Sequence, residues 1–273
     1  MKKLLTKEEF ETNIKPSDNM TYLEIKNNIF SKYPCIELKN FKRDFDLKIS
    51  QIDMNLNSLK TEKGTYYSMK CEYVILSKTK FGGYYTNFNI SFTNFKLSII
   101  DSCRDSYIAG NYEYYILSKF QNLKNSFIWS LNVMDKFLNL VLSTEGIYLK
   151  QGGWNYTNIK KLETKDDYIY SELLKFNQKY KDDKNGDLKG KIFVENIIFS
   201  EYANNVKHNK DNIIENEKYL ILGDYSEFDK ISDFFYKECL EKIILFYNDF
   251  IELVEKIIDY KYEKCDYKIN IKI

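Results

Sequence analysis

Apolar residues recur at spacings of three and four over most of the chain, which is the period of one face of an α-helix. The clearest stripe includes Tyr115, Phe127, Met134 and Val141, and no glycine or proline lies between its ends. The pattern predicts a short helix that begins with a capping-box sequence at Thr6, and helices over residues 22–32, 45–60, 66–78, 88–108, 112–142, 166–179, 191–206 and 226–262.

Glycines mark the predicted breaks between these helices. The pair Gly82-Gly83 is expected to turn the chain, and Gly146 is expected to follow the end of the 112–142 helix. Residues 152–164 should form a loop and a short helix, with Trp154 filling a gap in the core. The remaining predictions outside helices are an exposed loop over 181–190 and a short strand over 266–273.

The expected fold class is all-α, an up-and-down bundle of long helices. The chain has only 2 prolines and 10 glycines in 273 residues, so little interrupts its helical stripes. Both prolines lie in the first 40 residues, which look like a lead-in to the main body. We therefore expect an N-terminal helical extension over residues 1–110, packed on a helical bundle over residues 111–273.

Charge and composition narrow the classes of function. The formal net charge is +1, which gives no global footprint for coating nucleic acid or a membrane surface. The basic and acidic residues are interleaved, which is typical of solvated helix faces. No stretch approaches ~20 uncharged apolar residues, and the N-terminus does not have the pattern of a signal peptide. We expect a protein without a membrane segment, located in the cytoplasm.

The metal-binding side chains are sparse. The five cysteines are widely spaced without a Cys-x-x-Cys pair, and His208 is the single histidine. A zinc site would need an assembly of cysteines alone, so we expect reduced thiols, no metal and no cofactor. Neither a Walker phosphate loop nor a dinucleotide fingerprint occurs, and no Ser or Cys lies in a nucleophile elbow.

Two helices remain as carriers of chemistry. The helix over 112–142 places Ser130, Asp135 and Asn139 within an apolar stripe. Such polar groups need a partner across the bundle or must face solvent. The second helix leads into Asn204 and His208, which are four residues apart and therefore share a helix face. His208 is the only side chain with an unperturbed pKa near neutral pH, so it is the first choice for acid–base chemistry.

The first of these helices resembles an early core helix of the HEPN superfamily. In several bacterial branches of that superfamily, the helix carries a Ser/Trp-rich run that leads into Asp-Lys. The matching residues in this chain are Ser126, Trp129, Ser130, Asp135 and Lys136.

The second helix resembles the other HEPN motif, whose pattern is Arg, a polar residue, three variable residues and His. The polar residue is Asn204 and the histidine is His208, but Ala203 stands where the superfamily has arginine. Alanine cannot donate to a phosphate. The two motifs together extend the resemblance over about residues 112–262.

The resemblance implies a homodimeric helical protein that cleaves RNA without a metal, of a toxin or phage-defence type. It implies that His208 acts as the acid–base catalyst and that Asn204 orients His208 or the RNA. Lys207 and Lys210 would bind the RNA phosphate, although lysine lacks the bidentate fork of arginine. A partner protein such as an antitoxin is also implied.

Alternatives remain open for His208, for the Asp135 helix and, beside the RNA-cleaving protein, for the function of the whole chain. His208 can instead serve as a structural residue that interacts with the last carbonyls of its helix. The polar residues of the Asp135 helix can fix the packing of the bundle rather than take part in chemistry. Loss of the motif arginine would suit a catalytically inactive HEPN-like scaffold that binds a partner protein or a nucleotide. A plain helical interaction protein, with the 226–262 helix as its contact surface, is the third alternative.

Overall fold

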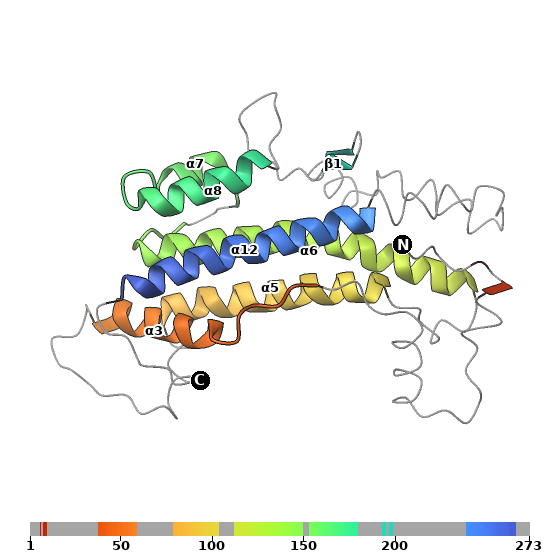
Figure 1. Cartoon of the computed structure of the whole chain (residues 1–273), viewed down its shortest axis with the longest axis horizontal. Coiled ribbons are helices and arrows are strands. Elements are labelled where there is room, and N and C mark those ends of the chain that lie inside the picture. The colour runs from red at the N-terminus through yellow and green to blue at the C-terminus, as the bar shows by residue number, and fades with distance from the viewer. Residues whose placement is uncertain are drawn as a thin grey trace. The chain divides into compact units, whose positions relative to one another are not determined.

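The protein is all-α, as the sequence predicts, in a computed structural model of the whole chain (Figure 1). The structure describes residues 6, 8–9, 38–58, 79–103, 112–149, 153–179, 193–194, 197–198 and 239–265. The described elements are the helices α3 (Phe45–Ser58), α5 (Lys80–Cys103), α6 (Tyr112–Thr144), α7 (Tyr156–Lys160), α8 (Asp167–Lys179) and α12 (Glu241–Glu263), and the two short strands β1 (Phe193–Val194) and β2 (Ile197–Ile198).

Contacts within the chain define two compact units, and each of them collects segments from distant parts of the sequence. Unit 1 contains Met1–Leu38, Asn94–Ser130 and Lys191–Tyr247, and unit 2 contains Lys39–Thr93, Leu131–Gly190 and Asn248–Ile273. The helices α5, α6 and α12 each contribute to both units. The predicted division into residues 1–110 and 111–273 follows a different boundary and stays a prediction.

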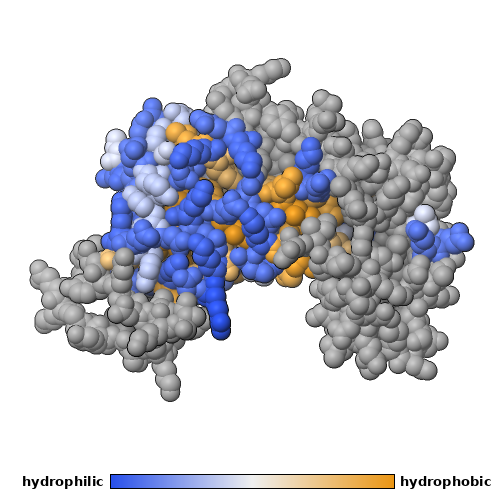
Figure 2. Space-filling model, in the orientation of Figure 1, coloured by the Kyte–Doolittle hydropathy of each residue, from blue (hydrophilic) through white to orange (hydrophobic). Residues whose placement is uncertain are grey.

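The core of unit 2 is built from aromatic rings. The Phe137 ring of α6 is fully buried, 5.5 Å from the Phe88 ring of α5 and 5.6 Å from the Phe250 ring of α12. Phe176 of α8 packs against Phe250 and against Trp154, which is 7% exposed. Trp154 therefore fills the core as predicted. Over much of the described surface facing the viewer, hydrophilic residues cover the hydrophobic ones (Figure 2).

In the described part of unit 1, the Phe95 ring of α5 meets two rings of α12. Its centroid lies 6.1 Å from that of Phe246 and 5.5 Å from that of Tyr247, in edge-to-face geometry. All three side chains are fully buried. Such pairs contribute about 0.5–1.5 kcal/mol beyond their area burial.

Two predicted helix ends are confirmed in detail. Thr6 and Glu9 form a capping box. The Thr6 N–H donates to Glu9 Oε2 at 2.8 Å, and the Glu9 N–H donates to Thr6 Oγ1 at 3.2 Å. At the end of α6, Gly146 has φ +69°, and the Ile147 N–H donates to the Leu142 carbonyl at 3.0 Å. This geometry ends the helix with a left-handed residue, which favours glycine.

The prediction of a turn at Gly82-Gly83 is wrong, because both glycines lie in the first turn of α5. The Thr79 hydroxyl accepts the Gly82 N–H at 2.8 Å, and the Thr79 carbonyl accepts the Gly83 N–H at 3.0 Å. A helix interior glycine costs about 1 kcal/mol relative to alanine. Capping by Thr79, together with burial of the apolar side of α5, outweighs that local cost.

The predicted helix over 191–206 is not formed at the four residues of it that the structure describes. There, Phe193 pairs with Ile198 and Val194 pairs with Ile197 in an antiparallel ladder. Two residues separate Val194 from Ile197 in the sequence, which is the spacing of a tight hairpin, and aromatic and β-branched residues favour strands. At these four residues, the helical spacing of apolar residues therefore predicted the wrong kind of element.

Three apolar residues of α8 are buried. Ile169, Leu173 and Phe176 point inward, whereas Tyr170 and Leu174 are only half-buried. The predictions for 22–32, 66–78, 181–190 and 266–273, and for the first part of the 226–262 helix, lie outside the described residues. Among the described helices, no stretch has the length and hydropathy that crossing a membrane requires.

Candidate functional site

The serines of the first motif are buried in α6 and satisfied within the helix itself. Ser126 and Ser130 are both 0% exposed. Their hydroxyls donate to the carbonyls of Leu123 and Phe127, three residues earlier, at 2.6 Å each. This removes the need for a partner across the bundle that the sequence indicated. Within the described residues, both hydroxyls bond inside α6 rather than to a base on another element, as a nucleophile would.

Asp135 of the same motif is held by the backbone that follows α6. Its Oδ1 accepts the Trp154 N–H at 2.5 Å. Burial raises the pKa of the Asp135 carboxyl above its ordinary value, and the Trp154 N–H and the nearby Lys136 charge partly oppose that shift. Trp129 and Lys136 are half-buried on the same helix. The carboxyl therefore works as an anchor between α6 and the start of the α7 segment.

The loop that supplies this N–H is itself ordered by side chains. Asn155 caps α7 by accepting the Asn158 N–H at 2.9 Å, and Asn158 Nδ2 donates to the Gly153 carbonyl at 2.9 Å. Trp154 Nε1 faces Asn177 Oδ1 of α8 at 3.4 Å. The Asp135 anchor thus lies inside a small polar network that fixes α7 and α8 on α6.

Gly153, directly before Trp154, also lies close to the Asp135 carboxyl. A Cβ added there would lie 3.0 Å from Asp135 Oδ1, and its three nearest atoms all belong to Asp135. We expect Gly153→Ala to lower the free energy of unfolding by about 1–3 kcal/mol, because the Asp135 carboxyl must shift away from the added methyl and its hydrogen bond to the Trp154 N–H is strained. Urea denaturation gives the value.

The control is the same change in an Asp135→Ala background. With the carboxyl removed, the three atoms nearest to the added methyl are gone, and Gly153→Ala should be neutral or slightly stabilising. Equal costs in both backgrounds would contradict the proposed contact, since a double-mutant cycle isolates the pairwise term.

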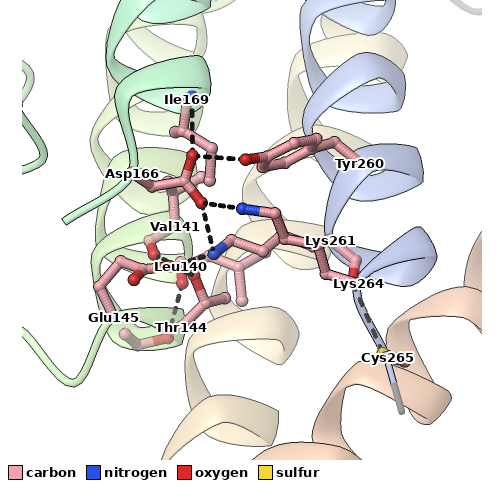
Figure 3. Close-up of polar contacts among 11 residues, drawn as sticks. Leu140, Val141, Thr144, Glu145, Asp166, Ile169, Tyr260, Lys261, Lys264 and Cys265 are labelled. Atoms are coloured by element: carbon pink, nitrogen blue, oxygen red, sulfur yellow. Dashed lines mark hydrogen bonds and ion pairs between the residues drawn. The ribbon is translucent and has the colours of Figure 1, made fainter. Parts of the chain in front are cut away.

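A second polar cluster, centred on Asp166, was not predicted from the sequence (Figure 3). The Asp166 side chain is 3% exposed and lies directly before α8. Its carboxylate accepts the Ile169 N–H at 3.3 Å, which caps α8, and the Tyr260 hydroxyl at 2.9 Å. Lys261 Nζ of α12 lies 3.2 Å from Asp166 Oδ2, and the Nζ atom of Lys264, the residue after α12, lies 3.3 Å from it.

The cluster extends from α12 to the end of α6 through Lys261. The Lys261 ammonium pairs with Glu145 as well as Asp166, and its side chain is 12% exposed. Glu145 also accepts the Thr144 hydroxyl at 3.2 Å. Two acids and two lysines from three separate segments therefore share one partly buried network, which clamps α6, α8 and α12 together.

The electrostatics of the Asp166 cluster indicate a structural role. Burial alone would raise the pKa of the Asp166 carboxyl, but the Ile169 N–H, the Tyr260 hydroxyl and Lys261 hold it below its ordinary value. A carboxylate that stays ionised and engages several donors is a poor proton shuttle at neutral pH. The sequence does contain one indication of the α8 cap, because an Asp three residues before Ile169 matches the N-cap pattern. No local signal connects it with Lys261, 95 residues away.

A more exposed ion-pair ladder joins α3 to α12. Asp259 Oδ2 accepts Lys42 Nζ at 2.6 Å, and Asp259 Oδ1 accepts Lys48 Nζ at 2.8 Å. Burial alone would raise the pKa of Asp259, but the two lysines hold it below its ordinary value. Asp44 adds a bond to Lys48 at 2.7 Å. This arrangement aligns the two helices.

His208, Asn204, Lys207 and Lys210, together with Ala203, lie outside the described residues. Their roles therefore stay predictions. Within the described part of the chain, no group of three or more His, Cys, Asp and Glu residues is placed to bind a metal ion.

Comparison of the chain with protein-family models, with curated proteins and with solved structures gives no match.

Proposed function

We propose that this protein is a HEPN-like helical protein that targets RNA, and that it cleaves RNA without a metal in a toxin or phage-defence system. The observation that carries the proposal is the placement of the first motif on α6. It is a 33-residue core helix on which the motif residues Ser126 and Ser130 are buried and Asp135 is anchored. The motif at Asn204 and His208 supplies the reactive groups.

In this proposal His208 removes the proton from an RNA 2′-hydroxyl. The oxygen attacks the adjacent phosphorus, the bond to the 5′-oxygen of the next nucleotide breaks, and a 2′,3′-cyclic phosphate and a 5′-hydroxyl result. The leaving oxygen takes a proton from a general acid, which a second copy of His208 supplies in a homodimer. Lys207 and Lys210 from both copies stabilise the phosphate charge and partly replace the missing motif arginine.

The test is cleavage of a mixed RNA substrate by the wild type and by His208→Ala, with EDTA present throughout. We expect His208→Ala to slow cleavage roughly 100-fold or more, as loss of a general acid–base group does. Asn205→Ala, at a variable position of the motif, is the matched control and should keep its activity. Far-UV circular dichroism confirms that each variant is folded. Equal cleavage by wild type and His208→Ala would contradict the proposal.

A second function is favoured by the missing arginine and by the engagement of Asp135. Ala203 cannot hold a phosphate, and the Asp135 carboxyl is already bound to the Trp154 backbone. The same bundle would then be an inactive scaffold that binds a partner protein, such as an antitoxin, or a nucleotide. Absence of cleavage by the wild type over a broad set of RNAs would favour this alternative.

A further inference from the structure

The segment that leads into α3 is bound along α12 although it forms no helix or strand. It comprises residues 39–42, whose sequence is Lys-Asn-Phe-Lys, and it precedes α3 in Figure 1. We call these four residues the strap. The strap and every residue that contacts it below belong to unit 2, so its binding is a property of that unit alone.

The first lysine of the strap is bound by two residues of α12 that are four positions apart. The Lys39 N–H donates to Asn248 Oδ1 at 3.0 Å, and the Lys39 ammonium pairs with Glu252. Residues four apart share a helix face, so one face of α12 binds both the main chain and the side chain of this lysine.

Lys42 is bound in the same way further along α12. Its N–H donates to Glu255 Oε1 at 2.7 Å, and its Nζ lies 2.6 Å from Asp259 Oδ2. The two pairs of acceptors are seven residues apart on α12, a rise of about 10.5 Å. Three residues of extended chain span about 10 Å. The repeat on α12 therefore matches an extended segment with lysines three positions apart.

Between the two lysines, Phe41 lies against aromatic rings of α3 and α5. Its ring stacks on that of Phe45 with centroids 4.1 Å apart, and it lies 4.3 Å from the Phe92 ring and 6.2 Å from the Phe88 ring. These three rings are buried, whereas Phe41 is half-buried. Extended peptides are recognised by this combination of main-chain hydrogen bonds and pockets for particular side chains.

We propose that α12 and the rings of Phe45, Phe88 and Phe92 form a peptide-binding groove, and that the strap is its tethered occupant, which a partner protein displaces. The partner supplies an extended cationic segment with the pattern Lys-x-Phe-Lys. The carboxylates of Glu252 and Asp259 complement its two lysines and repel acidic segments. This inference does not depend on RNA cleavage.

The contacts that hold the strap are of the kind that opens locally. The Lys39 and Glu252 side chains are 49% and 50% exposed, and Lys42 is 51% exposed. Exposed ion pairs contribute little to stability and weaken with salt. The Lys39 and Lys42 N–H groups donate to side chains, so their release breaks no helix or sheet.

The first test is binding of a fluorescein-labelled peptide with the sequence of residues 37–44 to the full chain, measured by fluorescence anisotropy. An acceptor variant that combines Lys39→Ala, Phe41→Ala and Lys42→Ala vacates the groove. It should bind the peptide roughly 10-fold more tightly than the wild type or better, because the tethered strap competes at an effective concentration in the millimolar range. A peptide that carries K39E and K42E should not bind.

Two pairs of substitutions in the acceptor variant locate the groove. Glu252→Gln with Asp259→Asn should weaken peptide binding roughly 10-fold or more, because both lysines lose a charged partner. Glu163→Gln with Asp167→Asn removes the same charge from exposed positions of unit 2 and should leave binding unchanged. Circular dichroism shows that each variant is folded.

Three results would overturn the proposal. They are no saturable binding by the folded acceptor variant, equal binding by the acceptor variant and the wild type, and equal losses for the two pairs of acid substitutions.

Hydrogen exchange of the wild type, followed by NMR, tests release of the strap without any substitution. Raising NaCl from about 0.05 to 0.5 M should speed exchange of the Lys39 and Lys42 amides roughly 5-fold, while the α12 amides stay protected. Excess peptide should also speed exchange of the two strap amides, because it takes the place of the strap. Strap amides that exchange only together with those of α12 would show that the strap does not open by itself, and would contradict the proposal.

Discussion

Replacing Asp166 with alanine is expected to lower the free energy of unfolding by about 3–5 kcal/mol, the range seen when one partner of a buried ion pair is removed. The reason is the number of groups that lose a partner together. The Ile169 N–H loses its cap, the Tyr260 hydroxyl loses its acceptor, and Lys261 loses one of the two acids that it pairs with in the described part of the chain. Urea denaturation at neutral pH provides the measurement.

Asp167→Ala is the matched control, since Asp167 is exposed and lies in the first turn of α8. Its removal should cost at most about 1 kcal/mol through the helix dipole. Equal losses for the two variants would show that Asp166 acts only through its charge near the helix end, and would contradict the clamp.

The effect of Asp166 should also depend on pH, with a sign that follows from its pKa. Because the folded-state pKa of Asp166 lies below its ordinary value, the stabilising contribution is present above the unfolded-state pKa, about 4. It is lost as the pH falls through the folded-state pKa. The difference in unfolding free energy between wild type and Asp166→Ala should therefore be largest near pH 7 and narrow in acid.

Phe137→Ala should have an effect of similar size, about 3–5 kcal/mol, because it opens a cavity at the centre of unit 2. The ring is fully buried and contacts Phe88 and Phe250, so α5 and α12 both lose packing. Phe137→Leu preserves much of the volume and should cost less than about 1.5 kcal/mol. Urea denaturation of both variants tests this order.

Ile128→Ala on the same helix is the control for Phe137. Its side chain is 37% exposed, so truncation should cost clearly less than truncation of Phe137. A loss at Ile128 equal to that at Phe137 would contradict the assignment of Phe137 as the central contact.

The helices were predictable where the helical spacing of apolar residues continues over a long stretch of the chain. The end of α6 at Gly146 and the capping box at Thr6 were also readable, because both involve residues within one turn. The first turn of α5 was misread, since the cost of two glycines is visible in the sequence and the tertiary burial that offsets it is not. The pairing of β1 with β2 was missed for a related reason, because a short apolar run does not distinguish strand from helix.

At the candidate site, too, the sequence indicated a residue but not its partner. The sequence singled out Asp135 as a polar residue in an apolar helix, and the structure supplied its partner, a backbone N–H that has no side-chain signature. The Asp166 cluster was invisible to pattern analysis, because in a chain with 41 basic and 40 acidic residues almost any charge has many conceivable partners. Only the packing of α12 against α6 and α8 selects Lys261 as the partner of Asp166 and Glu145.

The sequence by itself determined that this protein is built from long helices, since helical period, capping and glycine termination act between residues close in the chain. It also determined which helices carry polar residues in apolar surroundings, and it defined the motif at Asn204 and His208. Tertiary structure alone decided how the buried charges are paired and which glycines fit inside a helix. Those outcomes depend on burial and distance between remote segments, which folding establishes and local sequence does not encode.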